Sequence, residues 1–584
     1  MIRRWTFRVM IVVAAMMAPI LLVPFAVAGT ASVTVTSSRG ILPFGQTVDV
    51  SGSVTGDQPC EAGRTARLQW SAAGTATTFS TITETTTAGD GSFTFEDRPA
   101  ATGRYRAMLP ADGACAEITS NEAVVRVRVV VDASVVTASG DVGSCIDVTA
   151  IVSPAKPGQT VDLEKRVGGH WQLVETLPLN GDSEARAHPC LGWDDLGVAR
   201  YQVRWSPQDP LNETGTSPEL AVAVTEAPWM GRIDDLVGRR PVSIAVGEAD
   251  SFLYRHLDQA DRTPASNEKL LLAMTLLDHF GPDHRIPTMA MAENVNGRVV
   301  RGDLWLVGRG DPIVTPSSLA PLADQLVAAG IDRVTGQVLG STTYFSRDWD
   351  APGWNSVATD YVNRPTALTF RGNHDPDPER EAATALTKLL TTRGVQVRGR
   401  PGAGAAPGGL DTIATIESKP LTVLLAKMLR PSWNFAAEIL GKGLGADVRG
   451  TPGTIAKGAA TIQAWVRDHG ADFSLHDNSG LSYANHVDAA DIVRLLWTAE
   501  ASDWGDELRQ ALPTGGQGTL DDRLHSVKIR AKTGTLTDIS ALSGWVWADR
   551  LQTWIEFSIL SDVAKPAAAD IEDRIVRLLQ NYVG

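Results

Sequence analysis

Cysteine is scarce in this chain, and its few copies are unevenly placed. Among 584 residues there are four cysteines, all in the first third of the sequence. No Cys-x-x-Cys spacing occurs, which argues against a cysteine metal site. Cysteines of an exported protein are oxidised, and four allow three pairings. We expect the two pairings that each stay within one β-rich segment of the chain, Cys60–Cys115 and Cys145–Cys190.

An excess of positive charge is also missing. The formal net charge is −14, and no long basic run follows the N-terminus. A chain of this charge is a poor partner for nucleic acid or for anionic lipid. His279 and His284 are five residues apart across the helix-breaking pair Gly281-Pro282, whereas two zinc ligands on one helix face need a spacing of four. We therefore predict no metal and no cofactor.

A second long apolar run is absent too. Arg3, Arg4 and Arg8 precede one apolar run of 19 residues (28 − 10 + 1), which ends in Ala26-Val27-Ala28. This pattern predicts a secretory signal over residues 1–28, and an uncleaved membrane anchor is the alternative. In both cases we expect the rest of the chain to lie outside the cytoplasmic membrane, either extracellular or attached to the cell envelope.

Residues 29 to 226 have the pattern of β-strands separated by Gly, Asp and Pro turns. "TVDVSGSV", "ARLQWSA" and "AVVRVRVVV" belong to a first group, and "TVDLEKRV" and "ARYQVRW" to a second. Strands repeated about every ten residues favour β-sandwiches. We predict two of them, over 29–128 and 129–226, and they resemble immunoglobulin-like modules of bacterial surface enzymes. Spacing or wall adhesion would suit them, and an inert spacer is an equal alternative.

Residues 227–584 show a mixed pattern of helices and strands. Helices are expected in "EREAATALTKLLTTRG", "NFAAEILGKGLG" and the amphipathic C-terminal segment. "ALSGWVWAD" and "QTWIEFSILSD" predict two paired antiparallel strands near that end. The fold class expected for this region is α/β, an antiparallel sheet flanked by helices.

One short pair of polar residues stands at the start of a predicted helix. Ser266 and Lys269 are three apart in "TPASNEKLLLAMTLLDHFG", so they share one face of that helix. Ser266 could cap the helix, with Lys269 in solvent. Alternatively, a buried lysine that has lost its proton would be a general base for the serine hydroxyl. The pair alone does not decide between these readings.

Two further short motifs follow Ser266-x-x-Lys269 along the chain. Ser432-Trp433-Asn434 lies in "MLRPSWNFAAEIL", and Lys532-Thr533-Gly534-Thr535 lies just before the predicted strand pair. Separately they read as a helix cap and a β-turn. Together with Ser266-x-x-Lys269 they are the three elements of the penicillin-recognising serine enzymes.

The region from about 230 to 584 resembles the D-alanyl-D-alanine carboxypeptidases/endopeptidases among the low-molecular-mass class C penicillin-binding proteins. Besides the three motifs, the stretches "LVGRGDP", "LVAAGIDRVTGQVLGSTTYF", "DNSGLS" and "LPTGGQGTLDDR" are similar to that family. The resemblance implies a transpeptidase/β-lactamase-like domain over 227–584. It also implies peptidoglycan stem peptides as substrates and penicillins as acylating agents.

The resemblance also implies roles for individual residues. Ser266 would be the nucleophile, Lys269 its base and Ser432 the group that passes a proton to the leaving nitrogen. Substrate would be held by Asn434, by Lys532 and Thr533 at its carboxylate, and by the close approach that Gly534 permits. The backbone N–H groups of Ser266 and Thr535 would bind the oxyanion. The positive charge of Lys532 is expected to help lower the pKa of Lys269.

Two features depart from the family pattern. Trp433 stands where relatives usually have Asn or Asp, which predicts altered substrate contacts rather than lost chemistry. The 163 residues from Lys269 to Ser432 (432 − 269) are fewer than the family's two inserted subdomains need. We therefore expect one inserted subdomain, over about 285–410.

Two other functions remain open at this point. A class A β-lactamase would use a Glu-x-x-Leu-Asn element for deacylation, and no such string occurs. A non-catalytic wall-binding or adhesion protein with a vestigial enzyme domain is the alternative of another class, encouraged only by Trp433. The balance of carboxypeptidase and endopeptidase action, the stem-peptide preference and the oligomeric state are not indicated by the sequence.

Overall fold

The computed structural model describes residues 30–583, except 58, 75–77 and 114. The predicted signal or anchor over 1–28 lies outside the described residues. The chain divides into two compact units. Of the described residues, the first unit holds those from 30 to 138 together with Ile146–Pro189 and Arg200–Ala221. The second unit consists of Ser139–Cys145, Cys190–Ala199 and the described residues from Val222 to 583.

The first β-rich segment forms two sheets around one apolar core. Alternating burial along strands such as β9 (Ala123–Arg128) sends every second side chain inward, as a strand with one solvated face requires. The sheet orders are β1-β3-β6 and β2-β9-β7-β4-β5, and β8 pairs with β7. The other strands are β1 (Ala31–Ser37), β2 (Ile41–Pro43), β3 (Val48–Gly56), β4 (Thr65–Ala72), β5 (Ser80–Thr86), β6 (Ser92–Asp97), β7 (Gly103–Leu109) and β8 (Ile118–Thr119).

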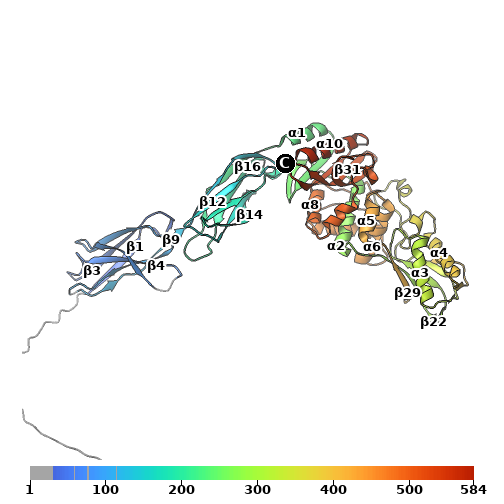
Figure 1. Cartoon of the computed structure of the whole chain (residues 1–584), viewed down its shortest axis with the longest axis horizontal. Coiled ribbons are helices and arrows are strands. Elements are labelled where there is room, and N and C mark those ends of the chain that lie inside the picture. The colour runs from blue at the N-terminus through green and yellow to red at the C-terminus, as the bar shows by residue number, and fades with distance from the viewer. Residues whose placement is uncertain (1–29, 58, 75–77, 114, 584) are drawn as a thin grey trace, which may run out of the picture. The chain divides into compact units, whose positions relative to one another are not determined.

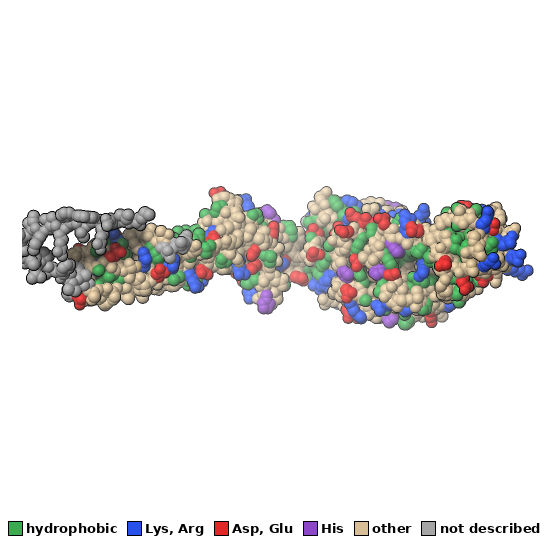
Figure 2. Space-filling view, turned by 90° about the horizontal axis from the view of Figure 1, so that it is seen from below, with side chains coloured by type: hydrophobic (Ala, Val, Ile, Leu, Met, Phe, Trp, Pro, Cys, Tyr) green, Lys and Arg blue, Asp and Glu red, His purple; other side chains and the backbone are tan. Residues whose placement is uncertain are grey.

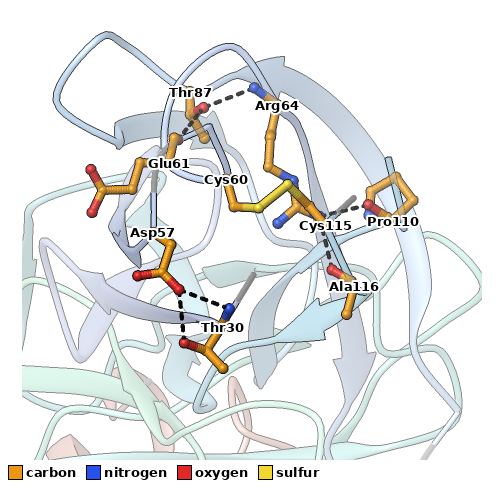
Figure 3. Close-up of a disulfide and its surroundings, with 9 residues drawn as sticks. All are labelled: Thr30, Asp57, Cys60, Glu61, Arg64, Thr87, Pro110, Cys115 and Ala116. Carbon is orange, nitrogen blue, oxygen red and sulfur yellow. Dashed lines mark hydrogen bonds between the residues drawn. A yellow bond between two sulfur atoms is a disulfide. The ribbon is translucent and has the colours of Figure 1, made fainter. Parts of the chain in front are cut away.

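The predicted disulfide Cys60–Cys115 is present in this segment, with its Cα atoms 5.6 Å apart. Arg64 lies beside it (Figure 3) and donates from Nη2 to the carbonyl oxygens of Pro110 and Ala116, at 2.7 and 3.0 Å. The Arg64 side chain is almost fully buried, so these bonds satisfy part of a charge that would otherwise be costly to bury. The disulfide and the arginine together tie the two loops at this end of the sheets.

The second β-rich segment also has two sheets, ordered β10-β12-β15 and β11-β18-β16-β13-β14, with β17 paired to β16. The predicted disulfide Cys145–Cys190 is present, and no described cysteine is free. The strands are β10 (Val130–Val135), β11 (Ser139–Asp141), β12 (Val148–Ser153), β13 (Thr160–Val167), β14 (His170–Pro178), β15 (Glu184–Ala187), β16 (Gly197–Trp205), β17 (Gly215–Thr216) and β18 (Leu220–Thr225).

The predicted antiparallel sheet with flanking helices forms the centre of the second unit. Its order is β20-β19-β32-β31-β30, and the predicted strand pair is β31 (Ile539–Ala548) with β32 (Thr553–Ser561). Helix α10 (Ala567–Tyr582) packs on β31 and α8 (Ala489–Glu500) on β19 and β32, on opposite sides of the sheet (Figure 1). The remaining elements of this layer are α1 (Pro228–Val237), β19 (Val242–Glu248), β20 (Ser251–His256) and β30 (Ile529–Leu536).

A helical cluster covers the α8 side of the sheet. Its helices are rich in Leu and Ala, and these side chains form one extensive buried core with residues of β31 and β32. Burying this much apolar surface is the main stabilising contribution to the unit. The helices are α2 (Glu268–Phe280), α5 (Leu421–Leu429), α6 (Asn434–Arg449), α7 (Ile455–Asp468), α8 and α9 (Gly505–Ala511).

The chain between α2 and α5 forms an insertion with one buried core of its own. Two sheets, β28-β26-β24-β21-β29 and β22-β23-β25-β27, pack with helices α3 (Pro316–Ala328) and α4 (Pro378–Thr392). Its strands run from 287 to 417, slightly beyond the expected range. They are β21 (Pro287–Ala292), β22 (Val295–Asn296), β23 (Val299–Val300), β24 (Leu304–Gly308), β25 (Arg333–Val334), β26 (Val338–Ser341), β27 (Gln396–Val397), β28 (Gly402–Gly404) and β29 (Asp411–Glu417).

Charged side chains of both signs are interspersed over the face shown in Figure 2. This mixture accords with a chain of 53 basic and 67 acidic residues. Among residues 30–583, where the structure describes them, no helix is long and apolar enough to cross a membrane.

Candidate active site

Ser266 lies in a short 3₁₀ turn, Ala265–Asn267, that leads directly into α2. It does not cap the helix, so the capping reading is wrong. Its Oγ instead accepts a hydrogen bond from Lys269 Nζ at 3.0 Å. The three-residue spacing places the amine over the hydroxyl, as helix geometry predicts.

Lys269 is completely buried, which excludes the reading of a solvated lysine. Besides Ser266 Oγ, its amine donates to Asn434 Oδ1 at 2.8 Å and to the carbonyl oxygen of Ser479. Three oxygen acceptors thus fix the position of the amine. The same Asn434 donates from Nδ2 to the carbonyl oxygen of Tyr361 at 3.2 Å, so the insertion contributes to the arrangement.

Burial lowers the pKa of Lys269 to about 8, although the charges of Asp477, Glu438 and Glu268 act in the opposite direction. The expectation that Lys532 contributes to this shift is not supported, because Lys532 is not among its causes. The charge repulsion between the two lysines instead affects the pKa of Lys532. Burial, followed by the charge of Lys269, lowers the pKa of Lys532 well below its usual value.

Ser432 occupies the turn between α5 and α6 and is also not a helix cap. Helix α6 begins two residues later, and its N-cap position is Trp433, which makes no side-chain cap. Ser432 has a φ of 58°, a left-handed conformation that is unfavourable for a residue with a side chain. Its Oγ accepts a hydrogen bond from Lys532 Nζ at 3.0 Å. The second and third motifs therefore meet through one hydrogen bond.

The third motif lies within strand β30 rather than in a turn before the strands. Lys532 is fully buried, and Thr533 Oγ1 donates to Thr519 Oγ1 at 2.7 Å. Gly534 stands so close to the turn before α2 that an added Cβ would lie 2.6 Å from the carbonyl oxygen of Pro264. A glycine is required here because a side chain would push the strand away from the turn that carries Ser266. Thr535 follows as an exposed residue.

The loop Asp477–Ser482, to which no role was assigned from the sequence, lies against the site. Asp477 is fully buried and accepts hydrogen bonds from the backbone N–H groups of Gly480, Leu481 and Ser482 at 3.0, 2.8 and 3.1 Å. These bonds shape the turn that presents the Ser479 carbonyl oxygen to Lys269. The stretch "DNSGLS", quoted above only for its resemblance, was the one signal for this loop.

Two buried glutamates adjoin the same loop. Glu268 lies next to Lys269 in sequence, and Glu438 Oε2 accepts a hydrogen bond from Asn478 Nδ2 at 2.8 Å. Burial, with the charge of Asp477 next, raises the pKa of Glu268 well above its usual value and that of Glu438 to about 7. Asn485 Nδ2 bonds to both Glu268 and Asp477. No local sequence pattern indicated that these acids share one buried cluster.

The histidines near the end of α2 form no metal site. His279 Nε2 lies 2.8 Å from Asp447 Oδ2. In the part of the chain that the structure describes, no group of three His, Cys, Asp or Glu side chains is arranged to hold a metal ion.

The arrangement has the chemical groups for nucleophilic catalysis. A serine hydroxyl contacts a buried amine with a lowered pKa, which is the requirement for removing its proton near neutral pH. A second serine hydroxyl contacts another buried amine. Sequence positions about 165 residues apart are joined by the bond between Lys269 and Asn434.

Two carboxypeptidases are similar to the chain over about two thirds of its length. A D-alanyl-D-alanine carboxypeptidase of Actinomadura sp. (strain R39) is 27% identical over 492 residues, covering 65% of this chain and 89% of the relative. A carboxypeptidase of Mycobacterium tuberculosis (strain ATCC 25618 / H37Rv) is 27% identical over 412 residues, covering 63% of this chain and 86% of the relative.

The fold agrees with a solved structure, penicillin-binding protein 4 (dacB) from Haemophilus influenzae. The TM-score is 0.51 at 19% identity, over 60% of this chain and 99% of that one. The family model of the D-Ala-D-Ala carboxypeptidase 3 (S13) family matches residues 235–375 and 374–582, more than half of the chain. With the motifs, the sheet and the family model in agreement, the chain belongs to the D-Ala-D-Ala carboxypeptidase 3 (S13) family.

Proposed function

We propose that Ser266 carries the acyl-enzyme of this serine-type D-alanyl-D-alanine carboxypeptidase, a low-molecular-mass class C penicillin-binding protein. One observation carries the assignment: the buried Lys269 amine lies 3.0 Å from the Ser266 hydroxyl oxygen. A lysine in this environment loses its proton near pH 8 and can take the hydroxyl proton.

The proposed reaction on peptidoglycan stem peptides has two stages. Ser266 Oγ bonds to the carbonyl carbon of the penultimate D-Ala while Lys269 takes the hydroxyl proton. The C–N bond then breaks, and the proton that Lys269 took from Ser266 reaches the leaving nitrogen through Ser432, whose Oγ lies 3.0 Å from Lys532 Nζ. Water then attacks the carbonyl carbon of the ester. The C–O bond to Ser266 breaks, a proton from the water passes to Ser266 Oγ, and the shortened peptide is released. Penicillins acylate the same oxygen.

The other motif residues receive binding roles in this proposal. Lys532 and Thr533 hold the terminal carboxylate of the substrate, and Asn434 binds an amide carbonyl group. The backbone N–H groups of Ser266 and Thr535 bind the oxyanion. The approach of Gly534 to the Pro264 carbonyl oxygen supports this assignment, because it keeps strand β30 against the turn that carries Ser266.

We further propose that the two N-terminal segments are immunoglobulin-like sandwiches that act as spacers on the cell envelope. The paired sheets of each segment support the sandwich architecture, and the two disulfides support an exported location. Residues 1–28 would serve as a signal or as a membrane anchor.

The two alternatives differ from this proposal in their chemistry. A β-lactamase would release penicillin rapidly and repeatedly, whereas the proposed enzyme keeps a long-lived adduct. A vestigial wall-binding protein would form no adduct. The intact contact between Ser266 and Lys269 disfavours the vestigial alternative.

The assignment is tested by replacing the nucleophile. Ser266→Ala is expected to abolish labelling by a fluorescent penicillin, because no oxygen remains to form the ester. The matched control is Ser317→Ala on the exposed start of α3, which should label like the wild type. Mass spectrometry of the intact protein after penicillin treatment, followed by peptide mapping, locates the adduct. Unchanged labelling of Ser266→Ala would show that another residue is the nucleophile.

A further inference from the structure

A cavity of about 270 Å³ lies where the insertion meets the helical cluster. Helices α2 and α6 and the first residue of α5 form one side, and strand β21 with the residues that follow β24 and β26 forms the other. Four of its lining residues are buried leucines, Leu276, Leu421, Leu440 and Leu444. None of the lining residues belongs to the three motifs. Concave and mostly apolar hollows of this kind, placed between domains, are where proteins bind small ligands.

A glycine without a packing role opens the wall that α6 contributes. Helix α6 contains Gly441, Gly443 and Gly445, although glycine destabilises a helix interior. An added Cβ at Gly441 would lie 2.2 Å from Asn478 Cγ, and one at Gly445 would lie 2.7 Å from a backbone nitrogen of α7, so packing requires both glycines. At Gly443 the nearest neighbours of an added Cβ lie 3.9 Å away. Because Gly443 lines the cavity, the absence of a side chain there leaves room for a ligand.

The rim of the cavity carries one cation without an acidic partner. Arg309 is exposed, and its guanidinium carbon lies 4.3 Å from the centre of the Tyr344 ring. Its guanidinium forms no hydrogen bond or ion pair with any residue that the structure describes. Arg309 is also the only lysine or arginine among the described residues that line the cavity. The rim therefore suits an anionic head group.

The other polar groups at the cavity do not compete for this role. Asp447 is engaged by His279, whose Nε2 lies 2.8 Å from its Oδ2. His284 stacks on Phe280 with ring centres 4.3 Å apart. Burial lowers the pKa of His284, so its ring is uncharged at neutral pH and adds apolar surface to the wall.

The volume indicates the size of the ligand body. An apolar cavity of about 150 Å³ can hold benzene with its six carbons, so about 270 Å³ holds roughly ten carbons by proportion. Removing such a body from water provides affinity, and a carboxylate attached to it would form a charge-assisted hydrogen bond with Arg309.

We propose that this cavity binds a small amphipathic carboxylate, with a hydrocarbon body of about ten carbons among the leucines and its head group on Arg309. No covalent bond is made or broken at this site. The site is separate from the proposed reaction, although α2 and α6 carry Lys269 and Asn434 at their opposite ends.

The test uses three probes that share one hydrocarbon chain: decanoate, decanol and decylammonium. Calorimetry on the full chain is expected to show decanoate bound about tenfold more tightly than decylammonium. Arg309→Glu should weaken decanoate about tenfold and leave decanol within about twofold, because only the carboxylate meets the reversed charge. The matched control is Arg301→Glu, at an exposed arginine of the same insertion, which should change neither value.

A second variant fills the cavity. Gly443→Leu is expected to weaken all three probes about tenfold, because the added side chain takes the place of the ligand body. Its matched control is Gly231→Leu, at a glycine of α1 where an added Cβ meets nothing within 4 Å, and binding should be unchanged. Penicillin labelling checks the fold of every variant, and Arg309→Glu decides the proposal if Gly443→Leu no longer labels.

Three results would overturn the proposal: no decanoate binding by the wild type, decanol or decylammonium bound as tightly as decanoate, or unchanged decanoate binding by Arg309→Glu. Ser266→Ala should bind decanoate like the wild type. A failure of this proposal is therefore distinguishable from a failure of the proposed nucleophile, which penicillin labelling measures.

Discussion

At the scale of single residues, the charge of Lys269 depends on opposing neighbours. Removal from water favours the neutral amine, whereas Asp477, Glu438 and Glu268 favour the ammonium. The raised pKa values of the two glutamates reduce their opposition, because a protonated carboxyl carries no charge. Desolvation therefore prevails over the acidic cluster, and the general base is usable near neutral pH.

We predict a pH dependence of acylation from the pKa of Lys269. With a pKa of about 8, about a tenth of Lys269 is neutral at pH 7, and the fraction rises toward one above pH 8. The second-order rate of penicillin acylation should therefore increase about tenfold per pH unit below 8 and level off above it. Fluorescent penicillin labelling between pH 6 and 9.5 measures the profile, with circular dichroism as a check of folding at each pH. A flat profile would contradict Lys269 as the titrating base.

At the same scale, the sequence predicted the three motifs but not the other residues that contact them. The spacing of Ser266 and Lys269 places them on one helical face, so their contact could be predicted locally. The partner Ser479 is 210 residues from Lys269, and no local pattern expresses that distance. The capping reading of Ser432 was wrong for the same reason, because its hydroxyl bonds to Lys532, which only the fold brings near. That of Ser266 was wrong because its hydroxyl bonds to Lys269 on the same helical face.

At the scale of elements, the site depends on how closely strand β30 approaches the 3₁₀ turn before α2. An added Cβ at Gly534 would meet Ala541 Cβ and Asn267 Nδ2 at 3.0 Å, besides the carbonyl oxygen of Pro264. The neighbours on both sides are backbone or packed side chains, so they have little room to move. The glycine sets the distance between the first and third motifs.

We predict that Gly534→Ala damages catalysis more than stability. Overpacking of this kind costs about 1–3 kcal/mol of unfolding free energy. A displacement of about 1 Å between reacting groups can lower the rate about 100-fold, and we expect a loss of that size in penicillin acylation. Denaturant unfolding and labelling kinetics measure the two effects.

The matched control is Gly408→Ala, where an added Cβ meets nothing within 4 Å. It should leave acylation and stability unchanged. Normal acylation by Gly534→Ala would mean that the close approach of the strand has no part in the reaction.

The predicted elements were mostly correct, because long amphipathic or alternating segments express their period locally. The β31–β32 pair and the C-terminal helix α10 are examples. The β-turn reading of the third motif was wrong, because Lys532 and the residues after it lie inside β30. Strand neighbours, rather than local preference, decide the conformation of such a segment.

At the scale of the whole molecule, the groups of the proposed reaction all belong to the second unit. The Cys60–Cys115 disulfide belongs to the first. The two cysteines are 55 residues apart in sequence, and a crosslink over such a loop stabilises a fold by about 4 kcal/mol in the chain-entropy account. Stability of the first unit and chemistry of the second should therefore respond separately.

We predict that replacing both Cys60 and Cys115 by alanine lowers the unfolding temperature of the first unit and leaves penicillin acylation within about twofold. Differential scanning calorimetry and labelling kinetics measure the two properties on the full chain. Because Cys145–Cys190 remains in the variant, the change reports on one disulfide only. A comparable loss of acylation would show that the first unit supports the active site.

The sequence by itself determined the types and order of the chemical groups, the disulfide pairs, and the placement of Lys269 one turn above Ser266. Each of these follows from spacing along the chain or from residues within one segment. Only the tertiary structure decided the burial of Lys269, the acidic cluster that opposes its discharge, and the hydrogen bond between Ser432 and Lys532. Desolvation and Coulomb interactions depend on distance in space, and the site draws on residues far apart in the sequence, such as Asn434 and Ser479 beside Lys269.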